Sequence, residues 1–162
     1  MNRIIIFLIN MILIPYLSIG QVTLIPDSNF ETALINLGYD SILDGEINTS
    51  SINNIDTLTL MYKNINDLTG IEDFTNLTVL NCDQNNLTSL NVSSNINLIR
   101  LTCTYNQLTT LTLNNNMTSL ECYFNNISNL DFSSCHYLEV VKCSYNQLTT
   151  LDMSHNVYLR LL

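Results

Sequence analysis

The chain has 162 residues and a formal net charge of −9, with five Lys or Arg residues against fourteen Asp or Glu. This length is enough for one ordinary domain. An acidic surface repels the phosphates of nucleic acids and anionic membranes, so the composition argues against nucleic acid as a partner. Nine of the acids fall between Asp27 and Asp73. The rest of the chain is therefore close to neutral and rich in uncharged polar residues.

The first twenty residues have the composition of a secretory signal peptide. Arg3 provides a positive start, the run from Ile4 to Leu17 is almost wholly apolar, and Ser18 and Gly20 are small residues suited to a cleavage site. A membrane span needs about twenty unbroken apolar residues, which this run lacks. We therefore predict removal of residues 1–20, a mature chain that begins at Gln21 without stable membrane insertion, and a secreted or cell-surface location.

Residues 21–54 predict a unit that differs from the rest of the chain. Within it, the segment from Asp27 to Leu37 has the pattern of an amphipathic helix, with Asp27 or Ser28 as the N-cap and Gly38 as the stop signal. Its expected apolar face consists of Phe30, Ala33, Leu34 and Leu37. We expect this helix to cap the repeats that follow, because a terminal repeat otherwise exposes apolar residues and an unpaired sheet edge.

After this helix, residues 40–47 partly match a calcium-binding loop. Asp40, Asp44 and Gly45 occupy the first, fifth and sixth positions of such a loop. The third position is Ile42 and the twelfth is Ser51, so two ligands are missing. We interpret this segment as a plain turn and predict no metal site.

From residue 55 to the end, the chain follows one repeated motif. Cysteines recur at intervals of 21, 19 and 21 residues within the pattern L-x-x-L-x-C-x-x-N-x-L, and they are Cys82, Cys103, Cys122 and Cys143. The short interval is interpreted as two residues missing between Asn116 and Met117. With that alignment, a second position holds Asn95, Asn116, Cys135 and Asn156. Four copies in register predict a repeat architecture.

This motif resembles the leucine-rich-repeat consensus, and the resemblance covers roughly Leu24 to the end. It implies an α/β repeat solenoid: a right-handed coil with a parallel β-sheet on the concave face, a mostly irregular convex side, and about five repeats, the last truncated. The unit from Ile55 to Phe74 resembles internalin-like repeats, and the later units resemble cysteine-bearing repeats of secreted Bacteroidota proteins. Such proteins often carry further repeats and a sorting domain, so we expect the chain to be part of a longer protein.

The polar and sulfur-bearing positions of the motif have separate expected roles. Alternating apolar residues point into the core, and the Asn after each strand satisfies backbone groups in a ladder. Lys63 replaces this Asn in the first repeat, so the ladder should start one repeat later. Cysteines on adjacent strands lie about 4.8 Å apart, whereas a disulfide needs Cβ atoms about 3.8 Å apart. We therefore predict four unpaired, buried thiols, and we interpret Cys135 as a tolerated substitution.

Candidate ligand-binding residues lie just before the Asn ladder, on the expected outward face of the sheet. They form an aromatic column, Tyr62, Tyr105, Phe124 and Tyr145, interrupted only by Gln84 and flanked by Tyr123 and Arg100. One interpretation is a binding strip for an extended partner. The other is that the rings stack on one another and shield the ladder beneath them. The two interpretations are compatible.

The motif offers no constellation typical of an active site. His136 and His155 fall at turns, and Asp131 and Asp152 recur at one place in successive repeats, as solvated positions do. We predict a non-enzymatic module, without cofactors, that binds a protein or a glycan outside the cell on its concave face. The alternative is a structural spacer for a catalytic or adhesive domain elsewhere in the protein.

Overall fold

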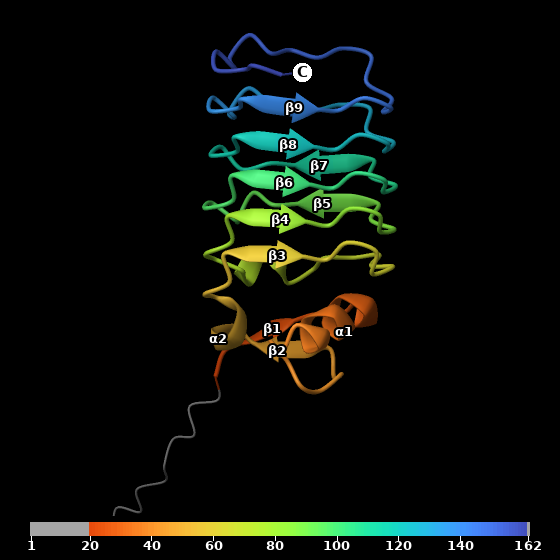
Figure 1. Cartoon of the computed structure of the whole chain (residues 1–162), viewed down its shortest axis with the longest axis vertical. Helices are drawn as coiled ribbons and strands as arrows, with labels where there is room; N and C mark the ends of the chain where they lie inside the picture. The colour runs from red at the N-terminus through yellow and green to blue at the C-terminus, as the bar shows by residue number, and fades with distance from the viewer. Residues whose placement is uncertain (1–19, 162) are drawn as a thin grey trace, which may run out of the picture.

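The computed structural model describes residues 20–161, which form a stack of rungs (Figure 1). Each rung contributes one short strand to a five-stranded parallel sheet, here called the front sheet. Its strands, in spatial order, are β3 (Thr57–Thr59), β4 (Val79–Asn81), β6 (Arg100–Thr102), β8 (Ser119–Glu121) and β9 (Val140–Lys142). Residues 1–19 lie outside the described part, so the signal peptide stays a prediction.

The front sheet is in strict register because each strand presents one apolar residue to the core. The central residues pair from strand to strand and are all buried: Leu58, Leu80, Leu101, Leu120 and Val141. A one-residue slip would turn every one of them towards solvent. A parallel bridge between Val140 and Leu161 continues the pattern beyond β9. The predicted parallel solenoid is confirmed.

The convex side is more ordered than the sequence predicted. Two successive rungs pair there in parallel through β5 (Ser89–Asn91) and β7 (Thr110–Thr112). In the first repeat a short 3-10 helix, η1 (Ile71–Asp73), occupies this side instead. The convex side is therefore irregular outside β5, β7 and η1.

The N-terminal unit lies at one end of the stack (Figure 1) and contains an antiparallel strand pair. Its elements are β1 (Val22–Leu24), α1 (Ser28–Asn36), β2 (Glu46–Asn48) and α2 (Thr49–Ile52). The predicted helix is confirmed as α1. The two strands and α2 had no recognisable pattern in the sequence. Among residues 20–161, no helix is both long enough and apolar enough to cross a membrane.

Both ends of α1 are closed by the signals expected for them. Asp27 is the N-cap, and its Oδ1 accepts the backbone N–H groups of Asn29 and Phe30 at 2.9 and 3.0 Å. At the other end, Gly38 has φ +81°, and its N–H donates to the carbonyl of Ile35. Leu37, placed on the apolar face by the sequence, is instead exposed, because it is the C-cap residue.

The turn that partly matches a calcium loop is held by a carboxylate from α1. The buried Glu31 accepts the backbone N–H groups of Asp44 and Gly45 through Oε1, at 2.8 and 2.7 Å. A buried carboxylate requires such partners. The segment is thus a turn organised by Glu31. Within residues 20–161, His, Cys, Asp and Glu do not form a group of three or more able to hold a metal ion.

The predicted Asn ladder runs along the end of the front sheet. Its members are Asn85, Asn106, Asn125 and Asn146. Asn106 represents them: its Nδ2 donates to the carbonyls of Cys82 and Cys103 at 3.0 and 3.2 Å, and its Oδ1 accepts the N–H of Leu87 at 3.0 Å. The ladder begins at Asn85, which accepts the N–H of Lys63. Its predicted start, one repeat after Lys63, is confirmed.

A second ladder follows the convex side and corrects the alignment of the short repeat. Asn95, Asn114 and Asn156 donate to carbonyls of the preceding rung, and the thiol of Cys135 contacts the carbonyl of Asn114 at 3.3 Å. Asn116, assigned to this position from the sequence, is exposed, whereas Asn114 is buried. The two missing residues therefore fall between Leu113 and Asn114.

The five cysteines are free thiols. Cys82, Cys103 and Cys122 are fully buried, as predicted, and burial raises the pKa of Cys122 to about 12. The prediction is wrong for Cys143, which is only half-buried. Cys143 lies in the last complete rung of the described chain, where less protein covers it. Cys135 is buried at the Asn position it replaces, which supports its interpretation as a tolerated substitution.

Candidate binding surface

The aromatic column lies beyond the ends of the front-sheet strands and not on the flat face predicted for it. Its members and Gln84 all adopt left-handed backbone conformations, with φ between 52° and 58°. Such φ values are uncommon for residues other than glycine. Here hydrogen bonds between rungs hold the turn: the N–H of Tyr105 donates to the carbonyl of Tyr123 at 3.1 Å, and that of Phe124 to the carbonyl of Ser144. The column therefore runs along the C-terminal ends of the front-sheet strands.

Three rings of the column stack face to face. The ring centroids of Tyr105 and Phe124 are 4.6 Å apart with an interplanar angle of 17°, and those of Phe124 and Tyr145 are 4.1 Å apart with an angle of 5°. Stacking is therefore real, but it does not bury the rings. Tyr105, Phe124 and Tyr145 stay 47%, 38% and 71% exposed. Phe124 is covered on both faces, whereas Tyr105 and Tyr145, at the ends of the stack, each have one face covered.

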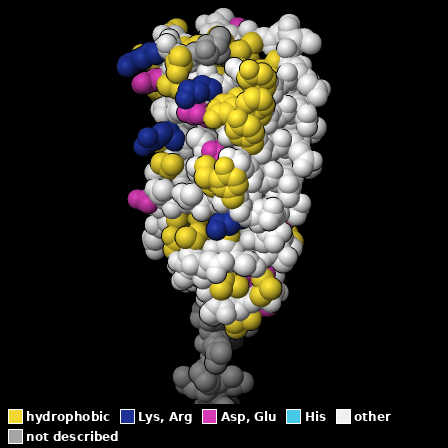
Figure 2. Space-filling view, turned by 45° about the vertical axis from the view of Figure 1, so that its right-hand side comes forward, with side chains coloured by type: hydrophobic (Ala, Val, Ile, Leu, Met, Phe, Trp, Pro, Cys, Tyr) yellow, Lys and Arg dark blue, Asp and Glu magenta, His cyan; other side chains and the backbone are white. Residues whose placement is uncertain are grey.

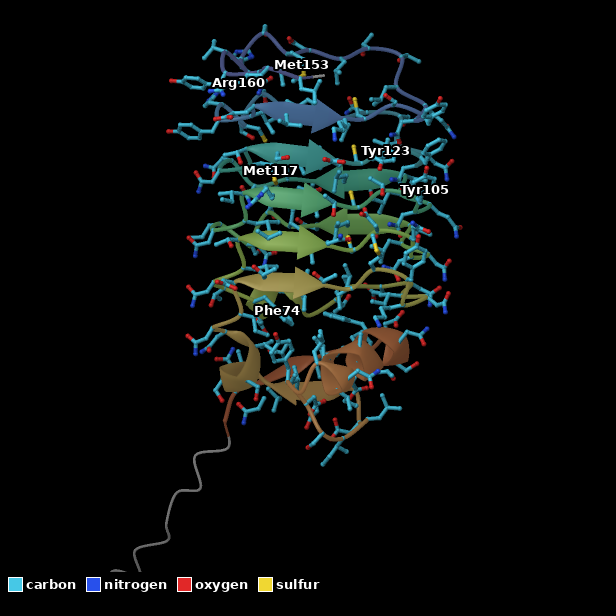
Figure 3. The ribbon with its side chains drawn as sticks, in the orientation of Figure 1. Phe74, Tyr105, Met117, Tyr123, Met153 and Arg160 are labelled. Carbon is cyan, nitrogen blue, oxygen red and sulfur yellow. The ribbon has the colours of Figure 1, made fainter. Side chains whose placement is uncertain are left out.

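Tyr123 joins the column, whereas Tyr62 and Arg100 are set apart from it. The Tyr123 ring meets Tyr105 and Phe124 edge to face, at centroid distances of 5.6 and 5.9 Å, and Figure 3 shows it beside Tyr105 where the strand arrows end. Gln84 separates Tyr62 from the stack. Arg100 is exposed at the start of β6, the end of that strand away from the column. The structure thus brings together four of the six predicted site residues.

A hollow of about 370 Å³ adjoins the upper part of the stack. It is lined by Tyr123, Phe124, Lys142, Ser144, Tyr145 and Leu161. Lys142 Nζ forms a hydrogen-bonded ion pair with Glu121 Oε1 at 2.9 Å, and this contact raises the pKa of Lys142. In Figure 2, hydrophobic side chains gather in a strip on this face beside charged ones. The hollow combines aromatic walls with an ion pair whose two charges balance each other.

A second exposed apolar group, which was not predicted from the sequence, lies at the opposite ends of the strands. Tyr137 and Tyr158 are 57% and 56% exposed, and Ile96 and Val157 are also exposed. Each Tyr follows a residue of the second ladder, Cys135 or Asn156, by two positions. That repeated spacing was the available signal. Among the aromatic contacts of the described residues, these two Tyr rings have no stacking partner, so they offer a matched control surface for the column.

The titratable groups recur with the repeat and serve the turns. Asp131 and Asp152 each accept the N–H of the residue two positions later, Ser133 or Ser154, at 2.9 Å. These hydrogen bonds lower the pKa of both carboxyls. The rings of His136 and His155 are exposed, with centroids 6.3 Å apart. The positions of the two carboxyls are explained by the turns they stabilise.

Comparison with solved structures identifies the architecture. An internalin C2 from Listeria monocytogenes superposes with a TM-score of 0.60 at 20% identity, over 89% of this chain and 79% of that one. An internalin F from the same organism gives 0.58 at 19% identity, over 85% and 49%. The chain is a leucine-rich-repeat solenoid. At these identities the likeness establishes the fold alone.

The functional domain of internalin J from Listeria monocytogenes, described as including a cysteine ladder, is 25% identical over 88% of this chain, with a TM-score of 0.48. The leucine-rich-repeat chain described here spans about half the length of that domain and of internalin F, and about four-fifths of internalin C2. No protein-family model matches the chain, and no curated protein matches it in sequence.

Proposed function

We propose that this solenoid is an extracellular protein-binding module, and that it contacts its partner through the aromatic column and the adjoining hollow. The observation that carries the proposal is the exposure of three stacked rings along the ends of the front-sheet strands. Aromatic side chains dominate interface energies because they bury a large area while losing little conformational entropy. Stacking adds to this advantage, because each ring is already held in place before binding.

The arrangement of the rings favours a protein over a glycan at this edge. Sugars bind aromatic residues by laying a C–H face on an open ring face, and here Phe124 is covered on both faces and Tyr105 and Tyr145 on one face each. Ring edges carry partial positive charge and suit carbonyl oxygens and apolar side chains, which a folded protein supplies together. The hollow beside Tyr145 would receive one such side chain.

We also infer that residues 21–54 form an N-terminal cap and that residues 55–162 form the repeats. The contacts of the N-terminal unit support this division. The Phe30 ring stacks at 6.2 Å on Phe74 of the first repeat, and Asp27 accepts the N–H of Asn66 through Oδ2. The apolar core of the repeats continues into α1 through these residues.

The test is a binding screen of the folded chain against an array of purified extracellular proteins. Replacing Tyr105, Phe124 and Tyr145 by Ser should abolish binding to a protein identified with the unmodified chain. Truncating hot-spot side chains costs about 2 kcal/mol or more each, which is more than tenfold in affinity. The far-UV circular dichroism spectrum should remain that of a folded solenoid, because the Asn ladder and core are intact.

The matched control replaces Tyr137 and Tyr158 by Ser at the opposite edge, and this variant should bind normally. Normal binding by the triple variant, or equal losses in the two variants, would show that the column is not the interface. Unfolding of the triple variant would show that its rings are structural. In that case the single variant Tyr145→Ser, at the most exposed ring, decides whether the column binds.

A further inference from the structure

The rung that contains β6 and β7, the third of the stack, lacks two residues between Leu113 and Asn114. This deletion opens the convex side of the solenoid. Leu111 and Leu113 are half-buried there, whereas the same positions in the neighbouring rungs are closed: Leu90, Val92, Leu130 and Phe132 are at most 6% exposed. The second rung makes a turn through Ser93 and Ser94 before its buried Asn95. The third rung lacks that turn and passes directly from Leu113 to Asn114. The missing turn uncovers the two leucines.

The same rung has an unpaired backbone edge. Strand β7 pairs with β5 on one side, and in the described chain it has no strand partner on the other. Among the described residues, no backbone hydrogen bond joins residues 109–114 to residues 128–134 of the next rung. Backbone N–H and C=O groups that lack protein partners need a hydrogen-bonding molecule in their place. The unpaired backbone N–H and C=O groups of β7 therefore make this side of the gap polar.

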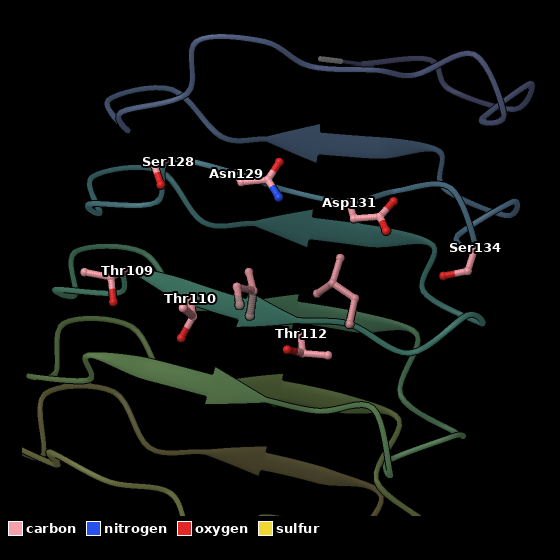
Figure 4. Close-up of a pocket in the computed structure, with 9 residues that line it drawn as sticks. Thr109, Thr110, Thr112, Ser128, Asn129, Asp131 and Ser134 are labelled. Carbon is pink, nitrogen blue, oxygen red and sulfur yellow. The ribbon is translucent and has the colours of Figure 1, made fainter.

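A cleft of about 370 Å³ occupies this gap (Figure 4). Thr110 and Thr112 lie on one side, and Ser128, Asn129, Asp131 and Ser134 lie on the other, while Leu111 and Leu113 also line it. Its volume falls within the range of small-molecule sites. The cleft is set on the convex side, apart from the aromatic column, whose residues do not line it.

The residue types that line the cleft exclude some classes of ligand. None of the described residues around the cleft is Lys or Arg, so an anion has no counter-charge, and none is aromatic, so a flat ring has no stacking partner. What remains is an apolar patch, several hydroxyls, an amide and one carboxylate. Hydrogen bonds from Ser133 lower the pKa of Asp131, so this carboxylate is ionised at neutral pH. These groups match a molecule with one C–H face and several adjacent hydroxyls.

We propose that this cleft binds a neutral sugar of hexose size. The Leu111 and Leu113 side chains would contact its C–H face. Asp131 would accept hydrogen bonds from a pair of its hydroxyls, while Asn129 and the free edge of β7 would bind the others. Oδ1 of Asp131 accepts the Ser133 N–H, and the second carboxylate oxygen would serve this role. This site is separate from the protein-binding edge and does not depend on it.

The experiment is a titration of the isotope-labelled full chain with D-glucose, D-galactose and D-mannose, followed by amide chemical shifts. We expect saturable shifts for residues 110–113 and 128–131 with at least one sugar, at a dissociation constant on the order of 1 to 10 mM. Asp131→Asn should weaken binding about tenfold or more, because a charged hydrogen bond is lost. The turn survives in this variant, because the amide oxygen of Asn still accepts the Ser133 N–H.

Two further variants keep the test specific. Asp152→Asn changes the equivalent carboxylate one rung later, outside the cleft, and should leave binding unchanged. Insertion of Ser-Ser between Leu113 and Asn114 restores the missing turn, closes the cleft, and should abolish the shifts. The absence of saturable shifts with all three sugars up to roughly 100 mM would overturn the proposal. So would shifts that persist unchanged in Asp131→Asn or in the insertion variant.

Discussion

At the scale of single residues, the ladder asparagines hold the solenoid together along one edge. Each reaches backbone groups of its own rung and of the preceding one, as Asn106 does for Cys82, Cys103 and Leu87. No other side chain of similar size carries two donors and an acceptor in this geometry without a charge. This explains why the motif keeps Asn, whereas its apolar positions tolerate Leu, Ile, Val and Met.

Asn106→Ala should lower the free energy of unfolding by about 2 to 4 kcal/mol, because two buried carbonyls and one N–H lose their partner. Urea denaturation followed by circular dichroism measures the change. The control is Gln107→Ala at the next, exposed residue, for which we expect a change within about 0.5 kcal/mol. Similar effects of the two substitutions would contradict the role of the ladder.

At the scale of elements, the cysteine column fills the narrow core behind the turn of each rung. Small apolar side chains suit this place, and free cysteine behaves as one. Burial raises the pKa of Cys82, Cys103 and Cys122, so these thiols stay protonated and unreactive. Cys143 has the same place in the motif but less protein above it.

In the folded 162-residue chain, a thiol-specific reagent should therefore modify Cys143 first. Cys82, Cys103, Cys122 and Cys135 should react only upon unfolding, and all five thiols should titrate in denaturant without a reductant. Cys143→Ser should remove the rapid phase and leave the slow one unchanged. Fewer than five thiols in the denatured protein would reveal a disulfide, and rapid modification of Cys82 would show that the core is open.

At the scale of the whole molecule, one carboxylate links the N-terminal unit to the first repeat. Asp27 caps α1 through Oδ1, and its Oδ2 accepts the backbone N–H groups of Asn66 and Asp67 at 2.8 and 3.2 Å. Burial alone would raise the pKa of Asp27, but the hydrogen bonds from Asn66, Phe30 and Asn29 together lower it. The ionised form is therefore favoured by folding.

The lowered pKa has a defined consequence for stability against pH. The contribution of Asp27 is present above its unfolded-state pKa, roughly pH 4, and is lost as the pH falls through the lower folded-state value. Asp27→Asn should cost about 1 to 2 kcal/mol at neutral pH. Denaturation midpoints should show this difference shrinking in acid. Asp56→Asn, at an exposed carboxylate, serves as control, and a difference for Asp27→Asn that is constant with pH would contradict the assignment.

The solenoid, its core positions, the front Asn ladder and α1 could be predicted from the sequence. These features depend on local pattern: apolar alternation, a repeated Asn and a capped helix are readable along the chain because each repeat restates them. The pairing of β1 with β2 and the strands of the convex side were not readable, since three-residue segments carry too little pattern and form only against their neighbours.

Tertiary structure alone decided which asparagine aligns the short rung. Asn114, Asn115 and Asn116 are chemically identical, and only the hydrogen bonds of Asn114 to the carbonyls of Asn95 and Leu98 distinguish it. The same holds for the aromatic column. Its spacing was visible in the sequence, but the left-handed turn that moves it to the sheet edge, and the stacking that covers its ring faces, depend on the neighbouring rungs. The convex cleft also depends on the neighbouring rungs. The two-residue deletion leaves a cleft because β7 has no strand partner in the next rung.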